Sequence, residues 1–286
     1  MKITGKTKQL AVIGDPADHS FSPVLHNFIS EYMGNDYTYS AYTVKPENLE
    51  NAINGMRAFG FAGINVTAPH KIEVMKYLDE ISSDAKILGS VNTIVNHEGK
   101  LTGYNTDSEG FYMSLTNAGI ETENKDILVL GCGGVVIPAL ARIIKTNPKS
   151  ITLLNRTKEK AKKISDELYN MTGYRVSTNK AHSAYDIIIN TTSAGMGAQK
   201  DALPWDSISE LSDDSFITEN SAAVDMIYNP ERTKFLTLAQ KKGAKILNGL
   251  DMLIYQGILA YELFTDTKLP DNIAELIRKE VFDKWI

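Results

Sequence analysis

The sequence contains a single cysteine among its 286 residues, and this scarcity excludes several classes of protein at once. One thiol, Cys132, can form no internal disulfide and can supply no cysteine-rich metal site. No apolar run approaches the ~18 residues that a membrane-spanning helix needs, and residues 1–6 lack the apolar stretch of a secretion signal. We therefore expect a cytoplasmic protein with no membrane segment and no bound metal.

An excess of positive charge is also missing. The chain carries 30 Lys and Arg against 35 Asp and Glu, which gives a formal net charge of −5. A mildly acidic surface repels the phosphates of nucleic acids, and the lysine pairs at 162–163 and 241–242 are typical of solvated helix faces. This excludes nucleic acid as a partner and favours a small-molecule substrate. The 43% of hydrophobic residues is ordinary for a globular protein, and the length favours two domains.

Short apolar segments alternate with amphipathic ones along the chain, which predicts an α/β fold. In the first part, strands are predicted at 9–14, 37–44, 61–67, 90–96 and 99–104, with helices from 22–23, at 46–59 and at 107–118. After a polar boundary at 121–125, strands are predicted at 126–130, 150–154, 186–190, 222–225 and 245–247, with helices ending near 147–148 and at 251–264 and 271–285. We predict two α/β domains, 1–120 and 121–264, with a cleft between them. A C-terminal helix at about 265–286 can pack back on the first domain.

A glycine-rich turn follows the continuously apolar strand 126–130 and opens a helix. The turn is Gly131-Cys132-Gly133-Gly134-Val135-Val136. Glycines let the backbone approach a pyrophosphate, and the helix N-terminus offers unpaired N–H groups to it. The simpler alternative is a tight turn without a ligand. The position of the turn at the start of the second domain favours a Rossmann-like dinucleotide-binding domain.

The end of the next strand indicates which dinucleotide binds. NAD-binding domains carry an acidic residue about 20 residues after the glycines, whereas this chain has Asn155-Arg156-Thr157 there. An arginine can pair with the 2′-phosphate of NADP, which an acid would repel. The alternative is a solvated loop arginine, but after a glycine turn the sequence favours NADP.

The only thiol of the chain lies inside this turn. Unpaired N–H groups at a helix N-terminus would lower the pKa of Cys132 and favour a thiolate. A buried free cysteine is instead an inert small residue. Both interpretations stay open, and the inert one is preferred.

Small polar side chains gather at the predicted strand ends of the first domain, in the stretches 20–23, 65–71, 91–93 and 105–107. Ligands of open α/β sheets bind at the carboxyl ends of the strands, so these groups can converge on a polyhydroxy substrate. Each stretch also has a simpler explanation. Ser22 and Asp107 can be helix N-caps, and Lys71 can be a solvated lysine. His19 and His70 are predicted to be structural.

Taken together and in order, these stretches resemble the motifs H-S-x-S-P, N-V-T-x-P-H-K, G-x-V-N-T and N-T-D of the shikimate dehydrogenase family. The resemblance continues with G-x-G-G, N-R-T, residues 225–230 and 248–253, and Gln256. It covers the chain from about His19 to Gln256. It implies an oxidoreductase that catalyses the reversible NADPH-dependent reduction of 3-dehydroshikimate to shikimate in aromatic amino-acid biosynthesis.

The resemblance also implies roles for residues at matching positions. Lys71 would be the acid–base residue with Asp107 as its partner, and which of the two carries the proton stays open. The implied substrate contacts are Ser20, Ser22, Thr67, Lys71, Asn92, Asp107, Tyr228 and Gln256. The implied NADP contacts are Gly131, Cys132, Gly133, Gly134, Val135, Asn155, Arg156, Thr157, Met226 and Gly249.

The chain departs from the usual family pattern at a few positions, which are Ser108, Cys132, Val135, Ile137, Pro138 and Asp251. Proline fits only the first turn of a helix, so the helix after the glycines is expected to begin late or to bend. Asp251 can be the N-cap of the following helix.

Two alternative functions stay open. One is a quinate/shikimate dehydrogenase that uses NAD, but relatives that accept quinate often carry threonine where this chain has Ser22. The other is a non-catalytic ligand sensor on the same fold, against which the retention of both Lys71 and Asp107 argues. A monomer and a homodimer are equally compatible with the sequence.

Overall fold

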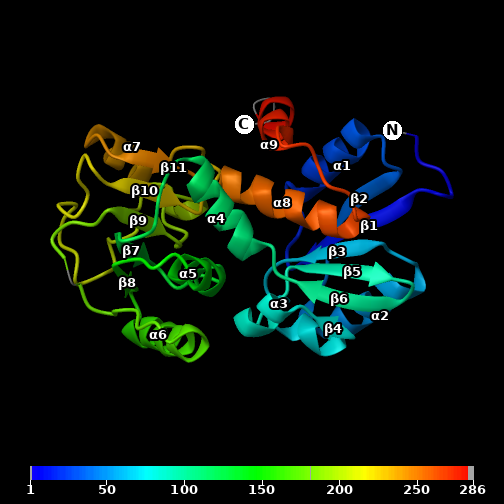
Figure 1. The fold of residues 1–286 in the computed structure, drawn as a ribbon, viewed down its shortest axis with the longest axis horizontal. Coiled ribbons are helices and arrows are strands. Elements are labelled where there is room, and N and C mark those ends of the chain that lie inside the picture. Colours follow the sequence, from blue (N-terminus) through cyan, green and yellow to red (C-terminus); the bar gives the residue numbers. More distant parts are fainter. Residues whose placement is uncertain (1, 181, 283–286) are drawn as a thin grey trace. The chain divides into compact units, whose positions relative to one another are not determined.

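The computed structural model of the protein describes residues 2–180 and 182–282. The chain forms two compact units, whose elements are labelled in Figure 1. Unit 1 comprises residues 1–107 and 254–286, and unit 2 comprises residues 108–253. Helix α4 (Asp107–Asn117) therefore groups with unit 2 after its first residue, and most of α8 (Leu250–Thr265) groups with unit 1. These boundaries differ from those expected at 120 and 264.

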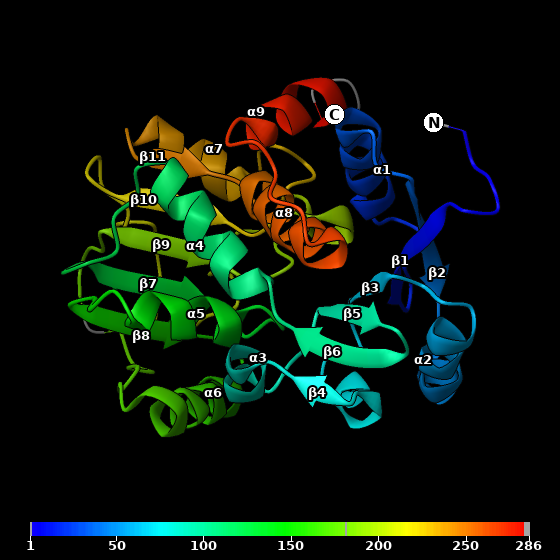
Figure 2. The same ribbon diagram turned by 45° about the vertical axis from the view of Figure 1, so that its right-hand side comes forward.

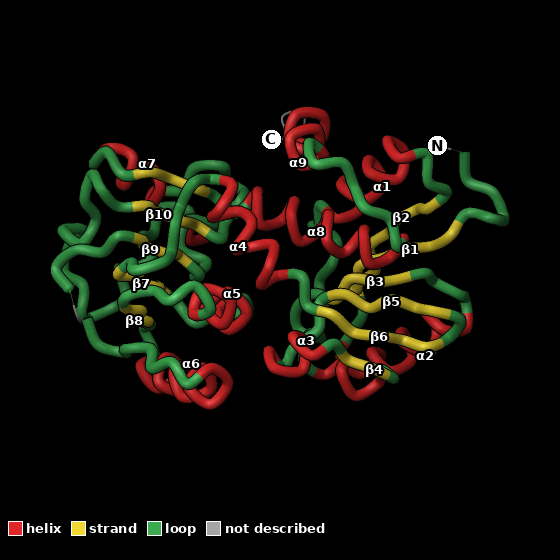
Figure 3. Tube along the Cα trace, in the orientation of Figure 1, coloured by secondary structure: helices red, strands yellow, loops and turns green. Residues whose placement is uncertain are grey.

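Unit 1 is built on a six-stranded mixed sheet in the order β2-β1-β3-β5-β6-β4, whose strands are yellow in Figure 3. Strand β1 runs parallel to β2 and β3, and β5 runs antiparallel to β3 and β6. The strands are β1 (Lys8–Gly14), β2 (Tyr37–Thr43), β3 (Gly63–Val66), β4 (Glu80–Ile81), β5 (Thr93–His97) and β6 (Lys100–Tyr104). The carboxyl ends of β1 and β3 lie side by side, which places the segments after Gly14 and after Val66 next to each other.

Helices cover the sheet of unit 1 through apolar side chains. Ile53 and Met56 of α2 belong to one core cluster with Ile13 and Ile64 of the sheet. On α8, the ring of Phe264 takes the space that a side chain at Gly63 would need. The remaining helical segments are α1 (Ser22–Met33), η1 (Pro46–Asn48), α2 (Leu49–Ala58), η2 (Glu73–Tyr77), α3 (Ser83–Leu88), α9 (Ile273–Ile277) and the π-helical η4 (Arg278–Phe282).

Unit 2 is built on a parallel five-stranded sheet in the order β11-β10-β9-β7-β8. Strands β7 to β10 are almost wholly buried, as expected when both faces of a parallel sheet are covered. Figure 2 shows α4 and α5 in front of this sheet. The elements are β7 (Asp126–Leu130), α5 (Val136–Ile144), β8 (Ser150–Leu154), α6 (Lys158–Thr172), β9 (Ile187–Asn190), η3 (Gly197–Gln199), β10 (Ala222–Asp225), α7 (Lys234–Lys241) and β11 (Lys245–Leu247).

The long segment between β9 and β10 contributes to the core of unit 2 without forming an α-helix. The ring of Trp205 lies edge-on to Phe216 at 5.1 Å and to Phe235 of α7 at 5.9 Å. All three side chains belong to one cluster with Leu128 and Ile188 of the sheet. Bulky aromatic side chains therefore cover part of this sheet face where a helix usually does.

Several local predictions needed correction. Phe21, not Ser22, precedes α1 as its N-cap, while Asp107 is the first residue of α4 and Asp251 the second residue of α8. Ser22, Asp107 and Asp251 therefore lie inside their helices, and a role as N-cap does not explain them. Pro138 is the third residue of α5, within the first turn where proline is tolerated, so this helix begins late as expected.

The helix predicted at 271–285 begins later than expected. It begins at Ile273 and continues as the π-helical η4, and its expected end at Trp285 lies outside the described residues. No helix in residues 2–180 and 182–282 combines the length and apolarity that crossing a bilayer demands.

Candidate functional site

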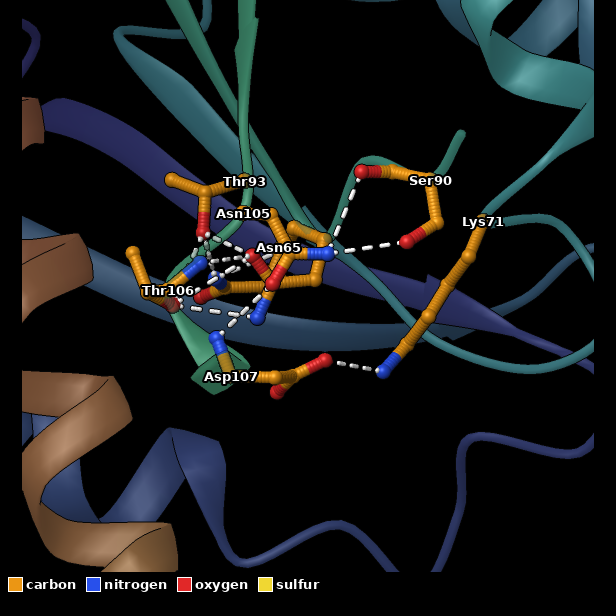
Figure 4. A network of polar contacts seen from close by, with 8 residues as sticks. Asn65, Lys71, Ser90, Thr93, Asn105, Thr106 and Asp107 are labelled. Carbon is orange, nitrogen blue, oxygen red and sulfur yellow. Dashed lines mark hydrogen bonds and ion pairs between the residues drawn. The ribbon is translucent and has the colours of Figure 1, made fainter. Parts of the chain in front are cut away.

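An ion pair between Lys71 and Asp107 lies at the centre of the polar stretches of unit 1. Lys71 follows β3 by a short turn and Asp107 opens α4, and Nζ lies 2.7 Å from Oδ2. Figure 4 shows the two side chains pointing toward each other. The lysine side chain is 23% exposed and the aspartate side chain 9%. The pair is thus shielded from bulk water yet open enough to meet a small molecule, which suits proton transfer to or from a bound hydroxyl.

Hydrogen bonds to one short segment hold both partners of this ion pair. The carbonyl of Lys71 accepts a bond from the N–H of Val91 at 2.8 Å. The N–H of Asp107 donates to Oδ1 of Asn105 at 3.1 Å, and Nδ2 of Asn105 donates to the carbonyl and hydroxyl oxygens of Ser90 at 3.1 and 2.9 Å. The segment that enters β5 therefore holds the backbone of both Lys71 and Asp107 in place.

Asn92 lies in a buried polar network beside Asp107. Its Oδ1 accepts from the N–H of Thr106 at 2.8 Å, and its Nδ2 donates to the hydroxyl of Thr106 at 3.0 Å. The hydroxyl of Thr93 also donates to this Oδ1, and Nδ2 of Asn65 donates to the Thr93 hydroxyl, both at 3.0 Å. Figure 4 shows Asn65, Thr93 and Thr106 of this network beside Asp107. These bonds hold Thr106, the residue before Asp107, in place. The sequence motifs had not indicated that Asn65, Thr93 and Thr106 take part in the site.

The network continues to Ser22 through a tyrosine of β2. The hydroxyl of Tyr39 donates to Oδ1 of Asn65 at 2.7 Å and is hydrogen-bonded to the side chain of Ser22. Burial raises the pKa of this phenol well above its usual value, so the hydroxyl keeps its proton. Because Ser20 accepts from the N–H of Ser22 at 3.3 Å, one chain of hydrogen bonds links both predicted serines to Thr106, the residue before Asp107. The sequence did not indicate Tyr39 as a site residue, because tyrosine is common in strands.

Thr67 and Gln256 complete the predicted set in unit 1. The methyl group of Thr67 fills the space beside Gly14, where a side chain would collide with it. Gln256 is half-buried on α8, next to Gly257, and the absence of a side chain there lets Leu25 of α1 approach the helix. Glycine at position 14 therefore leaves room for the side chain of Thr67, and glycine at position 257 lets α1 approach α8 beside Gln256.

The histidines of this region lie outside the polar network. His70 is 1% exposed, and its Nε2 lies 2.7 Å from the carbonyl of Val44, which makes it a structural residue. His19 is exposed in the loop before α1.

Tyr228 belongs to unit 2, in the loop that follows β10. The residue is half-buried, and burial raises the pKa of its phenol, so it keeps its proton near neutral pH. A protonated phenol can donate a hydrogen bond to a carboxylate or a carbonyl oxygen.

A cavity of about 480 Å³ lies at the carboxyl ends of β7, β8 and β9 in unit 2. Gly131 has φ +103°, and a side chain there would lie 2.5 Å from Cγ2 of Thr192. A side chain at Gly133 would lie 2.7 Å from the carbonyl oxygen of Thr191. The turn therefore needs glycine at both positions, and it fits a pyrophosphate that approaches the bare backbone. The residues that line the cavity include Gly131, Cys132, Gly133, Asn155, Arg156, Thr157, Lys160, Thr191, Thr192, Ser193, Ala194 and Asp206.

Two cations line this cavity, and the sequence analysis identified only one of them. Arg156 and Lys160 are both exposed, and Lys160 lies in the first turn of α6. Nδ2 of Asn155 donates to the carbonyl of Thr157 at 2.9 Å and shapes the turn between them. The signal for Lys160 was its place in the first turn of the helix that begins two residues after Arg156, which puts both residues near the N-terminal end of that helix. Two cations fit a phosphate group better than a nicotinamide or a neutral ribose.

Not all predicted cofactor residues line the cavity. Gly134, Val135, Met226 and Gly249 lie outside its lining. A side chain at Gly249 would collide with the carbonyl of Met226, so these two residues are close neighbours.

The hypothesis that the pKa of Cys132 is lowered, so that the thiolate is favoured, is wrong. Burial raises the pKa of the thiol to about 11, although the charge of Lys160 lowers it in part. The physical reason is desolvation of the half-buried thiol, which disfavours the charged thiolate; the helix that follows, α5, begins only at Val136. In residues 2–180 and 182–282, no three His, Cys, Asp or Glu side chains gather as metal ligands.

Comparisons with known proteins agree with this geometry. Residues 12–94 match the shikimate dehydrogenase substrate binding domain, residues 114–201 match shikimate / quinate 5-dehydrogenase, and residues 249–282 match the shikimate 5′-dehydrogenase C-terminal domain. The shikimate dehydrogenase (NADP(+)) of Methanococcus aeolicus is 41% identical over 278 residues, which are 96% of this chain and 97% of that protein.

Solved structures show the same relationship. A shikimate dehydrogenase in complex with NADP+ is 38% identical, with a TM-score of 0.90 over 100% of this chain and 98% of that one. Shikimate 5-dehydrogenase from Thermus thermophilus, in complex with NADP(H) and shikimate, is 33% identical, with a TM-score of 0.81 over 96% of this chain and 100% of that one. The α/β fold predicted from the sequence is confirmed, and the chain belongs to the shikimate dehydrogenase family.

Proposed function

We propose that this chain catalyses the reversible NADPH-dependent reduction of 3-dehydroshikimate to shikimate. The observation that carries the proposal is the shielded ion pair of Lys71 and Asp107, 2.7 Å apart, amid the polar network of unit 1. The family relationship supports the reaction, and the paired cations of the unit 2 cavity support NADP. Unit 1 then serves as the substrate domain and unit 2 as the NADP domain.

Each half of the reaction has a chemical counterpart in the chain. Bound NADP(H) would supply the hydride chemistry at the alcohol carbon. The Lys71–Asp107 pair donates the proton that the new hydroxyl needs in the reduction and takes it back in the oxidation. Asp107 holds the ammonium group of Lys71 in place, and the network through Asn105 and Ser90 holds Asp107.

The substrate contacts follow from the hydrogen-bonding capacity of each side chain. Ser20 and Ser22 contact the substrate carboxylate, and the hydrogen bond between Ser22 and Tyr39 connects this pair to the polar network. The ring hydroxyls and the region around the carboxylate are contacted by Thr67, Asn92, Tyr228 and Gln256.

The cofactor contacts divide by chemistry. The backbone of Gly131 to Val135, including Cys132, Gly133 and Gly134, faces the pyrophosphate, and Arg156 with Lys160 binds the 2′-phosphate. Asn155 and Thr157 shape the turn that presents Arg156. Met226 and Gly249 lie at the nicotinamide end.

Two alternatives remain distinguishable by experiment. A quinate/shikimate dehydrogenase that uses NAD needs no cation pair at the ribose, so Arg156 and Lys160 disfavour it. A non-catalytic ligand sensor needs no acid–base pair, so Lys71 and Asp107 disfavour it. We place the enzyme in the cytoplasm, as a monomer or a homodimer.

A four-way assay tests the proposal. Purified protein is mixed with shikimate or quinate and with NADP+ or NAD+, and absorbance is followed at the reduced-nicotinamide band. We expect the largest kcat/KM for shikimate with NADP+. A larger value for quinate with NAD+ would establish the first alternative, and no turnover in any combination would favour the sensor.

A further inference from the structure

A buried aspartate closes strand β10 and accepts hydrogen bonds on both of its oxygens. Asp225 is 1% exposed. Its Oδ1 accepts from Nδ2 of Asn190 at 2.9 Å and from the N–H of Ile227 at 3.0 Å, while its Oδ2 accepts from the hydroxyl of Thr233 at 2.7 Å. All three partners are donors, which suits an ionised carboxylate because it can only accept. Asp225 thereby fixes both ends of the loop from Met226 to Thr233.

Asn190 closes the neighbouring parallel strand β9 in direct register with Asp225. It is fully buried, and its Oδ1 accepts from the N–H and the hydroxyl of Thr192 at 2.9 and 2.7 Å. Its Nδ2 donates to Asp225 and also to the carbonyl of Ala194 at 3.3 Å. One pair of side chains, the Asp225–Asn190 pair, therefore joins two loops at the carboxyl edge of the sheet.

Both loops carry residues of the proposed cofactor site. Thr191, Thr192, Ser193 and Ala194 line the cavity that holds the glycine turn. The other loop carries Met226, and the carbonyl of Ile227 accepts from the N–H of Gly249 at 3.0 Å. The Asp225–Asn190 pair thus lies beneath the loop that we assign to the nicotinamide end.

Ionisation of the Asp225 carboxylate is energetically unfavourable at this buried position. Burial raises the pKa of Asp225 to about 6, in spite of the bonds from Thr233, Ile227 and Asn190 that lower it. An aspartate with a raised pKa disfavours folding at neutral pH, where an asparagine of the same shape would not. Structural support alone therefore does not explain why a carboxylate stands here.

We propose that the Asp225–Asn190 pair is a positioning device for the nicotinamide half of NADP, in which the carboxylate of Asp225 holds the loop of Met226 and Tyr228 against the neighbouring strand end. The inference rests on the proposed function, since it assumes that unit 2 binds NADP. Neither side chain needs to touch the cofactor, because each acts through the backbone of its loop.

The test separates the two halves of the cofactor. Dissociation constants are measured by calorimetry for NADP+ and for adenosine 2′,5′-bisphosphate, a fragment that lacks the nicotinamide half. The variants are Asp225→Ala, which leaves three donors without an acceptor, and Asp225→Asn, which keeps the shape of the side chain and carries the test if the alanine variant fails to fold. The control is Asp186→Asn at the opposite end of β9, where the carboxylate accepts from the N–H of Asp126 at 2.8 Å.

We expect Asp225→Ala to raise the Kd for NADP+ by roughly tenfold or more, as for the loss of a charge-assisted hydrogen bond. Asp225→Asn keeps an acceptor for Asn190 and Ile227 but removes the acceptor of the Thr233 proton, so we expect a smaller increase of roughly threefold. The Kd for the bisphosphate should stay within about twofold in both variants, and Asp186→Asn should match the wild type for both ligands.

Two results would overturn the inference. If Asp225→Asn, together with any Asp225→Ala protein that folds, binds NADP+ as tightly as the wild type, the pair does not position the cofactor. If affinity for the bisphosphate falls as much as affinity for NADP+, the effect is general loosening of unit 2. Failure of the wild type to bind either ligand would instead overturn the NADP assignment itself, and the positioning role with it.

Discussion

The ammonium group of Lys71 and the carboxylate of Asp107 lie 2.7 Å apart, although 36 residues separate them in the chain. The contact arises because β3 and β6 end at neighbouring positions of the unit 1 sheet, with β5 between them. A short turn after β3 then brings Lys71 back over the strand ends, where α4 begins with Asp107.

Removal of this lysine should abolish most of the turnover. We expect Lys71→Ala to lower kcat by roughly 10²–10⁴-fold, as for a lost acid–base group, while the KM for shikimate changes far less. Lys100→Ala is the matched control, because Lys100 also forms a 2.7 Å ion pair, with Glu80, but both partners are 56% exposed. Steady-state kinetics of the two variants make the comparison. Near-wild-type turnover in Lys71→Ala would remove Lys71 from the mechanism.

The paired cations of the unit 2 cavity should decide cofactor preference. Because the 2′-phosphate is absent from NAD, Arg156→Ala should raise the KM for NADP+ roughly tenfold or more and leave the KM for NAD+ nearly unchanged. Lys160→Ala should shift the preference in the same direction. Lys163→Ala, a 78% exposed lysine on the same helix, serves as the control. Equal increases in KM for both cofactors would show that the two cations do not bind the 2′-phosphate.

The short apolar strands of unit 2 could be predicted from the sequence almost to the residue. Strands β7, β8, β10 and β11 begin and end where the sequence places them, because parallel strands buried on both faces are continuously apolar and bounded by polar residues. The glycine turn could also be predicted, because positions that admit no side chain must be glycine and so appear in the sequence. In the structure, Gly131 has φ +103°, and a side chain at Gly133 would collide with the carbonyl oxygen of Thr191.

The contacts that tertiary structure creates could not be predicted in this way. Tyr39 reaches Asn65 across the sheet, and nothing in an ordinary strand sequence indicates that its hydroxyl takes part in a network. The covering of one sheet face by Trp205 and Phe216 leaves no periodic pattern, because the segment forms no α-helix. Strand β4 and helix α3 were missed because two and six residues carry too little periodicity.

The buried carboxylate of Asp225 should make stability depend on pH. Its pKa is about 6 in the folded protein against 3.8 ordinarily, so the unfolded chain releases this proton first as the pH rises. The contribution of this group to stability is therefore fully present below about pH 4 and is lost as the pH rises through about 6, with a size of about 3 kcal/mol. We expect Asp225→Asn to be more stable than the wild type at pH 8 and to lose that advantage at pH 4.

Urea denaturation of the wild type, Asp225→Asn and Asp186→Asn at both pH values measures this difference. The Asp186→Asn variant corrects for carboxylates elsewhere in the sheet of unit 2. An unfolding free energy of Asp225→Asn that follows the wild type in parallel from pH 4 to pH 8 would contradict the raised pKa.

The single thiol of the chain offers a chemical test of the cofactor cavity. Cys132 is half-buried, lines the cavity, and has a pKa raised to about 11, so at neutral pH little of it is the thiolate that reacts with iodoacetamide. We expect slow labelling at neutral pH. Below the pKa, the labelling rate should rise about tenfold with each unit of increase in pH, because the thiolate fraction does. The attached group would occupy the space of the pyrophosphate, so activity should fall in step with the labelled mass, and bound NADP+ should slow both. Because the chain has no other cysteine, Cys132→Ser should take up no label and gives the background of the mass measurement. A fully labelled protein with undiminished activity would show that the thiol points away from the cofactor, into the packing between α5 and the sheet.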